Sequence, residues 1–409
     1  MKILFVSPYL PGPPVFGGQR RIHGLMSALG KLHEVSLIAL VDPAKDASAG
    51  LNDARNYCQN VVTVPDALHR VSGRTKRLLQ LRSLVSRESW EQKLHRRPAF
   101  QRALDAHLER HHYDIVNCEF VFMGGYRFGA KTLGNTRVAL DEHNVEYDIL
   151  SRTADASRLD RKIYNSVNHY KLKHEELAAW ARFDGVSFTS DRDRDIARRE
   201  TPSAVTEVIP NGVDVDTFRP QPSDQTDPNV ILFFGAINYF PNSDAVSFFV
   251  QNVFPLLSAK HPDLRVRIVG PGAPEQILAM RSERVEVVGF VDDLRAEIAR
   301  AAVVVAPLRI GGGTRLKILE AMGVAKPIVA TRIGAEGIDV QHERDILLAD
   351  SPEDLARQIE RVIQDAELAA RLGTAARQTA ELHYSWSAAA QKLANFYGTL
   401  LARPPRQGR

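Results

Sequence analysis

Short apolar runs alternate with longer helical stretches along nearly the whole chain, and this alternation restarts near the middle. In the first half, the runs typical of buried parallel strands are Ile3–Val6, Val35–Leu40, Val61–Val64, Ile115–Asn117, Val138–Leu140, Val186–Phe188 and Val205–Ile209. In the second half they are Val230–Phe234, Val266–Val269, Val285–Val288, Val303–Ala306, Pro327–Ala330 and Ile346–Leu348. A repeated strand, crossover, strand pattern predicts a doubly wound α/β domain, and its restart predicts two of them.

The segment Pro210–Asn229 carries turn residues and prolines between the two strand series and predicts the domain boundary. We therefore assign residues 1–210 and 211–385 to two Rossmann-like domains, for which a chain of 409 residues is long enough. Residues 386–409 contain a helical pattern, and we expect this helix to pack back on the first domain. Open α/β sheets bind ligands outside the carboxyl ends of their strands, so we expect the site in a cleft between the domains.

The composition excludes several classes of protein. Cys58 and Cys118 are the only cysteines, too few and too far apart for a disulfide framework or a structural zinc site, and they fit a reducing compartment. The amino terminus lacks the long apolar core of a signal peptide. No apolar stretch approaches the roughly 20 residues that a membrane span needs. We therefore expect a cytoplasmic protein.

The segment Gly311–Gly323, GGGTRLKILEAMG, joins a glycine-rich loop to a helix that is expected to start at about Thr314. The free N–H groups and the dipole of such a helix favour an anion such as a diphosphate. Lys317 in the first turn can meet a phosphate, and Glu320 can accept hydrogen bonds from ribose hydroxyls. Taken alone, the pattern fits a capped helix with a surface Lys–Glu pair equally well.

Four segments in combination resemble the family-4 retaining glycosyltransferases. They are Val208–Phe218 (VIPNGVDVDTF), Val266–Gly272 (VRIVGPG), Val285–Leu294 (VEVVGFVDDL) and Arg309–Gly337 (RIGGGTRLKILEAMGVAKPIVATRIGAEG). The resemblance implies the GT-B fold, with two Rossmann-like domains facing each other across a cleft. It also implies an acceptor-binding first domain and a second domain that binds a nucleotide sugar, either a UDP-, a GDP- or a dTDP-sugar. The sugar would pass, with retention, to a hydroxyl of a glycan, a lipid-linked or a small-molecule acceptor in polysaccharide, glycolipid or glycoconjugate synthesis.

The same resemblance assigns the donor site. Glu320 matches the second glutamate of the family's E-x7-E motif, which holds the ribose, but Gly312 stands where the first is expected. The family's loop cations are also missing, because Gly235–Ala245 (GAINYFPNSDA) contains no Lys or Arg. Lys317 is therefore expected to meet the diphosphate, with Arg309 and Arg315 as alternatives. The expected donor-binding residues are Gly17, Gly18, Gly235, Gly289, Phe290, Arg309, Gly312, Gly313, Thr314, Arg315 and Glu320, and the expected catalytic residues are His143 and Lys317.

His143 lies in DEHNVEYDIL, after the predicted strand Val138–Leu140. The family places on a similar loop a histidine that contacts the transferred sugar. Glu142 and Glu146 are weaker candidates for the same site.

Two further features are read in terms of helix starts. Gly17 and Gly18 match the family's amino-terminal glycine motif near the diphosphate, and the adjacent Arg20 or Arg21 either reaches a phosphate or lies on a solvated helix face. In the second domain, we interpret Asn242 and the serine after it as the N-cap of a helix.

No D-x-D motif has the context of a metal site. Asp191–Asp193 has the spelling, but it follows Ser190 and predicts a capped helix start, so we expect no metal ion. Two alternatives to a transferase stay open. One is a sugar-nucleotide epimerase of the GT-B fold. The other is a non-catalytic sugar-nucleotide binding protein, which the missing first glutamate suggests.

Basic side chains are concentrated in residues 70–110. Within this block, Arg82–Leu108 interleaves arginine with leucine, valine, Trp90 and Phe100, as an interfacial helix does. This pattern predicts docking on an anionic membrane surface, at the inner face of the plasma membrane. A solvated, partly packed pair of helices explains the pattern as well. No base-stacking aromatic pattern accompanies the block, so no nucleic-acid partner is expected.

Overall fold

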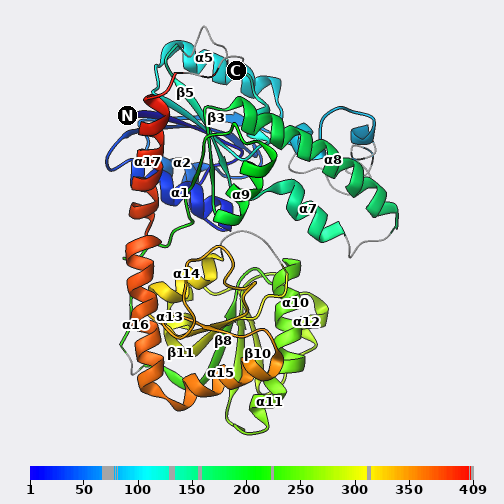
Figure 1. Ribbon diagram of the computed structural model, residues 1–409, viewed down its shortest axis with the longest axis vertical. Helices are drawn as coiled ribbons and strands as arrows, with labels where there is room; N and C mark the ends of the chain where they lie inside the picture. The colour runs from blue at the N-terminus through cyan, green and yellow to red at the C-terminus, as the bar shows by residue number, and fades with distance from the viewer. Residues whose placement is uncertain are drawn as a thin grey trace. The chain divides into compact units, whose positions relative to one another are not determined.

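The computed structural model divides the chain into two compact units, each built around its own parallel sheet (Figure 1). The first unit comprises Met1–Pro210 and Ala389–Arg409, and the second comprises Asn211–Ala388. The structure describes residues 1–66, 78, 80, 82–128, 134–154, 159–222, 225–310, 315–404 and 406.

The first unit contains a seven-stranded sheet in the order β3-β2-β1-β4-β5-β6-β7, with every neighbouring pair parallel. Its strands are β1 (Lys2–Ser7), β2 (Glu34–Val41), β3 (Asn60–Pro65), β4 (Ile115–Glu119), β5 (Arg137–Glu142), β6 (Gly185–Phe188) and β7 (Thr206–Val208). All the strands predicted for the first half are confirmed to within two residues. Their runs are continuously apolar because both faces of the sheet are covered.

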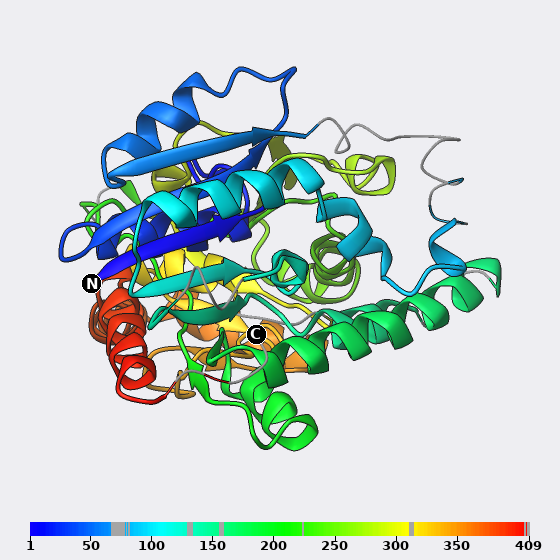
Figure 2. The ribbon, with the colours of Figure 1, turned by 90° about the horizontal axis from the view of Figure 1, so that it is seen from above.

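The helices of the first unit connect these strands. They are α1 (Gly17–Leu29), α2 (Ser48–Arg55), α4 (Trp90–His95), α5 (Pro98–Arg110), α7 (Glu146–Ala154), α8 (Leu159–Arg182) and α9 (Asp191–Glu200), with a 3-10 turn at Met123–Gly125. Figure 2 shows the long helix α8, in green, extending beyond the edge of the sheet. The predicted cap of α9 is confirmed, since the Ser190 hydroxyl accepts the Asp193 N–H.

Helix α17 (Trp386–Leu401) begins in the second unit, and its residues from Ala389 onward belong to the first. Phe396 and Leu400 pack so closely on Gly185 that a Cβ there would lie 2.7 Å and 2.6 Å from their side chains. The carboxyl-terminal part of the helix therefore closes over the start of β6.

The second unit contains a six-stranded parallel sheet in the order β10-β9-β8-β11-β12-β13. Its strands are β8 (Asp227–Phe234), β9 (Arg265–Val269), β10 (Val285–Gly289), β11 (Ala301–Ala306), β12 (Ile328–Ala330) and β13 (Leu347–Leu348). Its helices are α10 (Phe240–Phe248), α11 (Phe254–Ser258), α12 (Glu275–Leu278), α13 (Leu294–Arg300), α14 (Leu316–Gly323), α15 (Pro352–Gln364) and α16 (Ala366–His383), with a π-helical turn at Phe249–Val253. Figure 1 shows helices on both sides of this sheet.

Each sheet has one point at which the strand order reverses direction. In the first unit the reversal lies between β1 and β4, and in the second it lies between β8 and β11. Loops leave in opposite directions from the carboxyl ends of such neighbouring strands, and the space between them is where open α/β sheets bind ligands.

The interfacial helix predicted over Arg82–Leu108 is not formed. The segment is broken into helical residues 82–84, α4 and α5, and Arg96 and Arg97 separate α4 from α5. On α5, Phe100, Leu104 and Leu108 are buried in the core against the sheet instead of facing outward. Residues 70–77, 79 and 81 of the basic block lie outside the described residues. Among the helices that are described, none combines the length and the apolar character needed to cross a membrane.

Candidate functional site

A buried ion pair links the helix after β1 to the carboxyl end of β5 in the first sheet. Arg21 on α1 donates from Nε and Nη2 to both carboxylate oxygens of Asp141 at the end of β5, each at 2.7 Å. Its Nη1 donates to the carbonyl of Ile209 at 2.9 Å, and the hydroxyl of Ser187 donates to Asp141 at 2.6 Å. Arg21 therefore neither reaches toward a phosphate nor lies on a solvated helix face.

His143 lies next to this ion pair. Its Nε2 is 2.7 Å from Oε2 of Glu119, the last residue of β4, and 3.6 Å from Asp141. The ring of Phe120 packs against the imidazole with centroids 3.7 Å apart. The structure thus brings the predicted His143 together with an acid on the neighbouring strand, at the carboxyl edge of the sheet.

Burial controls the protonation of this cluster. Burial lowers the pKa of His143 to about 3, so the imidazole is neutral at physiological pH. Burial, and then the charge of Asp141, raise the pKa of Glu119 well above its usual range. Burial also acts to raise the pKa of Asp141, but the Arg21 guanidinium outweighs it and holds that pKa below the ordinary value. Asp141 is therefore the ionised carboxylate of the cluster.

Glu142 and Glu146, the two weaker candidates, make contacts that stabilise the first unit. Glu142 is buried and accepts the indole N–H of Trp180 at 3.1 Å and the backbone N–H of Val121 at 3.2 Å. Glu146 begins α7, and its own backbone N–H donates to Glu176 at 2.8 Å. These contacts tie α7 and α8 to the sheet.

Among the described residues, Glu119, Asp141 and His143 form one group whose possible metal-ligating atoms all lie within 4.8 Å of one another. Both oxygens of Asp141 already accept hydrogen bonds from Arg21, so the positive charge of the cluster comes from a guanidinium. The donor set therefore fits an Arg–carboxylate pair better than a bound metal ion.

Gly17 and Gly18 begin α1, as the glycine motif predicts. A Cβ at position 18 would lie 2.3 Å from the hydroxyl oxygen of Tyr9, so the glycine allows the loop after β1 to fold onto the helix.

In the second unit, three neighbouring strands end in glycines whose φ is positive. Gly235 follows β8 with φ 145°, Gly270 follows β9 with φ 139°, and Gly289 ends β10 with φ 87°. A Cβ on Gly270 would lie 1.8 Å from the carbonyl oxygen of Gly235, whereas one on Gly289 would meet no described atom within 4 Å. Bare backbone therefore lines this edge of the sheet, and Phe290 stands beside it with 71% of its surface exposed.

Lys317 lies over this edge, in the first turn of α14. Its ammonium donates to Oδ1 of Asn242 at 2.7 Å and lies 4.1 Å from the centroid of the Phe233 ring. A Cβ on Gly235 would be 3.2 Å from Nζ. Burial, and then the charge of Arg315, lower the pKa of Lys317 to about 7.

Asn242 was interpreted from the sequence as a helix cap, and that interpretation is wrong. Helix α10 starts at Phe240, so Asn242 lies inside its first turn. Its Nδ2 donates to the carbonyl of Ala236 at 2.8 Å, which leaves Oδ1 to hold Lys317. Asn242 thus fixes the one lysine of the α14 turn against the strand end.

The other donor-site candidates differ in their contacts and in their burial. Arg309 is engaged by both oxygens of Asp244, with Nη2 to Oδ1 at 2.6 Å, and its guanidinium stacks on Phe248. Arg315 precedes α14 and is buried, as is Glu320, so a surface Lys–Glu pair is not formed. Gly312, Gly313 and Thr314 lie outside the described residues.

Three residues of these clusters were missed by sequence reasoning: Glu119, Asp141 in its role as partner of Arg21, and Asn242 in its role as partner of Lys317. Glu119 is the last residue of the buried strand β4, and Asp141 is the last but one of the buried strand β5. An acid at that place was a usable signal.

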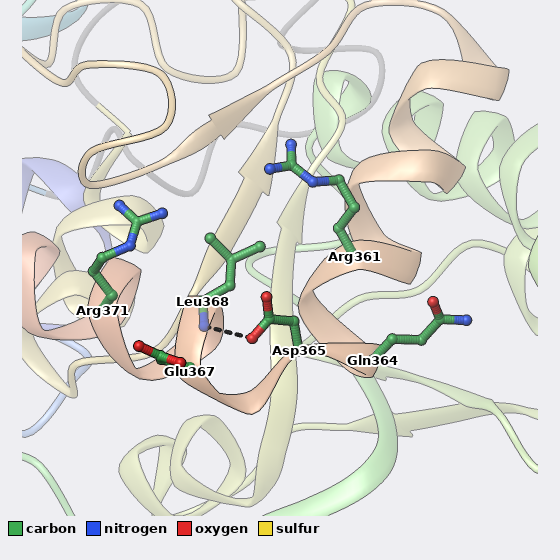
Figure 3. Close-up of a pocket in the computed structure, with 6 residues that line it drawn as sticks. All are labelled: Arg361, Gln364, Asp365, Glu367, Leu368 and Arg371. Carbon is green, nitrogen blue, oxygen red and sulfur yellow. Dashed lines mark hydrogen bonds between the residues drawn. The ribbon is translucent and has the colours of Figure 1, made fainter.

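A surface hollow of about 390 Å³ lies between α15 and α16, lined by Arg361, Gln364, Asp365, Glu367, Leu368 and Arg371 (Figure 3). Asp365 there caps α16 through the N–H of Leu368, and Arg361 pairs with Glu343. Helix α15 follows β13 and runs back along the sheet, so this hollow lies toward the amino ends of the strands. It is separate from the glycine-lined edge.

Two family models match the chain. The one described as Glycosyltransferase Family 4 matches residues 15–217, and the one described as Glycosyl transferases group 1 matches residues 228–365.

Two relatives match part of the chain at about one quarter sequence identity. A GDP-mannose-dependent alpha-(1-6)-phosphatidylinositol monomannoside mannosyltransferase of Mycobacterium tuberculosis is 26% identical over 240 residues, which are 52% of this chain and 61% of that protein. An uncharacterised 44.6 kDa protein in the cps region of Klebsiella pneumoniae is 25% identical over 251 residues, covering 58% of this chain and 62% of that protein. The matches thus span about three fifths of the relatives' length.

Solved structures share the fold. Sucrose-phosphate synthase of Thermosynechococcus elongatus has a TM-score of 0.70 at 19% identity, covering 98% of this chain and 100% of that one. HepE of Anabaena, in complex with UDP and glucose, has a TM-score of 0.64 at 17% identity with the same coverage. TarM has a TM-score of 0.70 at 11% identity, covering 97% of this chain and 99% of that one. The predicted two-domain Rossmann-like GT-B fold is confirmed.

Alanine substitution at the three strand-end glycines is expected to lower the free energy of unfolding most at Gly270, less at Gly235 and least at Gly289. The positive φ costs about 1–2 kcal/mol at each position. Gly270→Ala adds a clash with rigid backbone, Gly235→Ala adds contact with the movable Lys317, and Gly289→Ala adds none. Chemical denaturation of the three variants measures this order. Equal losses at all three positions would mean that the close approach of β8 and β9 is not rigid.

Proposed function

The chain belongs to the family-4 glycosyltransferases, group 1, and on that premise we propose that it transfers a sugar from a nucleotide diphosphate donor to a hydroxyl acceptor. The observation that carries the proposal is a lysine held over a glycine-lined strand end at a reversal point of the second sheet.

In this proposal the second unit binds the donor. The backbone at Gly235 admits a diphosphate close to the sheet, and the ammonium of Lys317 lies beside it to balance the phosphate charge. Gly289 and Phe290 flank the nucleobase, and Glu320 holds the ribose. Arg309 is a weaker candidate for the phosphate, because Asp244 already balances its charge.

His143 acts in this proposal at the transferred sugar. Its imidazole is neutral, so it offers a hydrogen bond rather than a charge. Lys317 stabilises the negative charge that develops on the departing diphosphate. The acceptor hydroxyl attacks the anomeric carbon from the face that this group leaves, as the bond from that carbon to the diphosphate oxygen breaks, and the hydroxyl proton passes to the leaving phosphate oxygen. Positioning and charge stabilisation then supply the rate enhancement. The retaining outcome follows from the resemblance to the family.

The acceptor is proposed to be lipid-linked, because the named Mycobacterium tuberculosis relative is a phosphatidylinositol monomannoside mannosyltransferase. A surface segment supports a location on the inner face of a membrane. Val85 is 91% exposed, and the exposed Arg82 and Arg87 flank it. These residues lie outside α4 and α5, so they are available even though the single interfacial helix is absent.

The proposed activity is tested by incubating the full chain with a panel of UDP-, GDP- and dTDP-sugars and a lipid-linked acceptor. We expect one donor to raise the melting temperature, by mass action, and to give a glycosylated product. We expect turnover to persist in excess chelator. Loss of turnover that magnesium or manganese restores would contradict the metal-free mechanism. Release of an epimerised nucleotide sugar, or binding without any product, would instead favour an epimerase or a binding protein.

Lys317→Ala is expected to weaken nucleoside diphosphate binding roughly ten- to a hundredfold while leaving nucleoside binding nearly unchanged. The reason is the loss of a charge-assisted hydrogen bond to phosphate, worth about 1.5–3 kcal/mol. Glu320→Ala is the matched comparison, since losing a ribose partner should weaken both ligands by similar factors. Calorimetric titration of both variants with both ligands, beside melting curves, separates these results from unfolding of α14. Normal diphosphate binding by Lys317→Ala would move the assignment to Arg315.

Nucleoside diphosphate affinity is also expected to fall as the pH rises above about 7. The ammonium form of Lys317 binds the phosphate, and its pKa in the free protein is about 7. The fraction of the free protein in which Lys317 is protonated drops roughly fivefold between pH 7 and pH 8. Lys317→Arg keeps its charge throughout this range and should bind with little pH dependence. An unchanged pH dependence in Lys317→Arg would show that another group titrates.

A further inference from the structure

Glu119, a buried acid of the first unit, has no role in the sugar transfer proposed above. Glu119 is fully buried at the end of β4, and its Oε2 lies 2.7 Å from Nε2 of His143. A hydrogen bond at this position fixes which nitrogen of a neutral imidazole carries the proton.

Two arrangements of this hydrogen bond are possible. An ionised Glu119 would accept from an Nε2–H, leaving Nδ1 as an acceptor. A protonated Glu119 would donate to Nε2, leaving an Nδ1–H as a donor. Among the described residues, the imidazole of His143 makes no hydrogen bond other than the one to Glu119, so its Nδ1 is the nitrogen left for a substrate.

The charges around Glu119 decide between these arrangements. The titratable side chains that interact electrostatically with it are Tyr9, Arg21, Cys118, Asp141 and Tyr397. Arg21 is the only cation of this set, and both of its forked donors go to Asp141. An ionised Glu119 would therefore be a second buried negative charge without its own cation, which proteins avoid.

The hydrogen-bond donors around the two acids also favour a protonated Glu119. Asp141 receives hydrogen bonds from Arg21 and Ser187, whereas Glu119 receives one, from Nδ2 of Asn117 to Oε1 at 2.8 Å. The second oxygen of Glu119 faces only the imidazole.

We propose that Glu119 is a positioning residue that donates its carboxyl proton to Nε2 of His143 and so holds the imidazole as the Nδ1–H tautomer, a hydrogen-bond donor toward the sugar. This inference deepens the proposed function and rests on it for the identity of the substrate. The tautomer of His143 is set in the protein without ligand, so it can be measured there whatever the substrate is.

Asn117 makes Glu119→Gln an informative variant. Its Nδ2 already donates to Oε1, so the amide oxygen of a glutamine must occupy that side and the amide NH2 must face His143. Glu119→Gln therefore reproduces the donor of a protonated acid. Glu119→Ala removes the donor. Glu142→Gln is the matched control, because Glu142 is equally buried but bonds Trp180 and Val121 rather than His143.

The tautomer is measured on the full chain labelled with 15N in histidine, by long-range 1H–15N correlation. The His143 signals are assigned by their loss in His143→Ala. We expect the Nδ1–H pattern in the wild type, in Glu119→Gln and in Glu142→Gln, and a mixture of tautomers in Glu119→Ala. An Nε2–H pattern in the wild type would overturn the proposal whether or not the protein transfers sugar.

Turnover provides the second readout. With a donor found in the sugar panel, Glu119→Ala should lower kcat about tenfold, as expected for one lost hydrogen bond, with donor KM changed less than about twofold. Glu119→Gln should restore most of this loss. If Glu119→Gln lowers kcat as much as Glu119→Ala at an unchanged melting temperature, the active form needs the carboxylate and the proposal is wrong. If no donor reacts with any variant, the proposed function fails and the tautomer result still stands.

Discussion

The first unit depends on one buried ion pair, between Arg21 and Asp141. The pair joins α1 to β5, and through the carbonyl of Ile209 it reaches the chain just before the second unit begins. Removing one member of a buried pair typically costs about 3–5 kcal/mol, because the other charge is left without a partner. The pair also determines the chemistry beside it. Because Asp141 takes the guanidinium, Glu119 is left to the imidazole of His143.

In the second unit, the candidate cation is held at the carboxyl edge of the sheet without a carboxylate partner among the described residues. This cation, Lys317, is held by an amide oxygen and an aromatic ring rather than by a carboxylate. A neutral partner positions the ammonium without balancing its charge, so the charge stays available for an anion. Arg309 illustrates the contrast, since Asp244 both positions and neutralises it. In each unit these groups lie at the carboxyl edge of the sheet, at or one strand away from the point where the strand order reverses.

The strands were predictable because a parallel strand covered on both faces is continuously apolar over a short, local stretch. His143 and Lys317 could be proposed from the sequence because each lies in a local motif. The partners of these residues could not, since His143 and Glu119 are 24 residues apart and Lys317 and Asn242 are 75 apart. Asn242 was also misread because an asparagine near a helix start has a common local use as a cap. The interfacial helix failed for a related reason: an amphipathic pattern does not say whether its apolar side meets lipid or, as for Phe100, the protein core.

The close approach of Gly270 to the carbonyl of Gly235 has a consequence for anyone who wishes to redesign this edge of the sheet. Directed evolution usually samples side chains, but Gly270 accepts no side chain without moving the main chain, and a side chain at Gly235 would displace Lys317 and Asn242. A library that varies Gly270 would therefore yield mostly misfolded proteins. Useful diversity has to come from the residues that surround this bare backbone, such as Phe290 and Asn242.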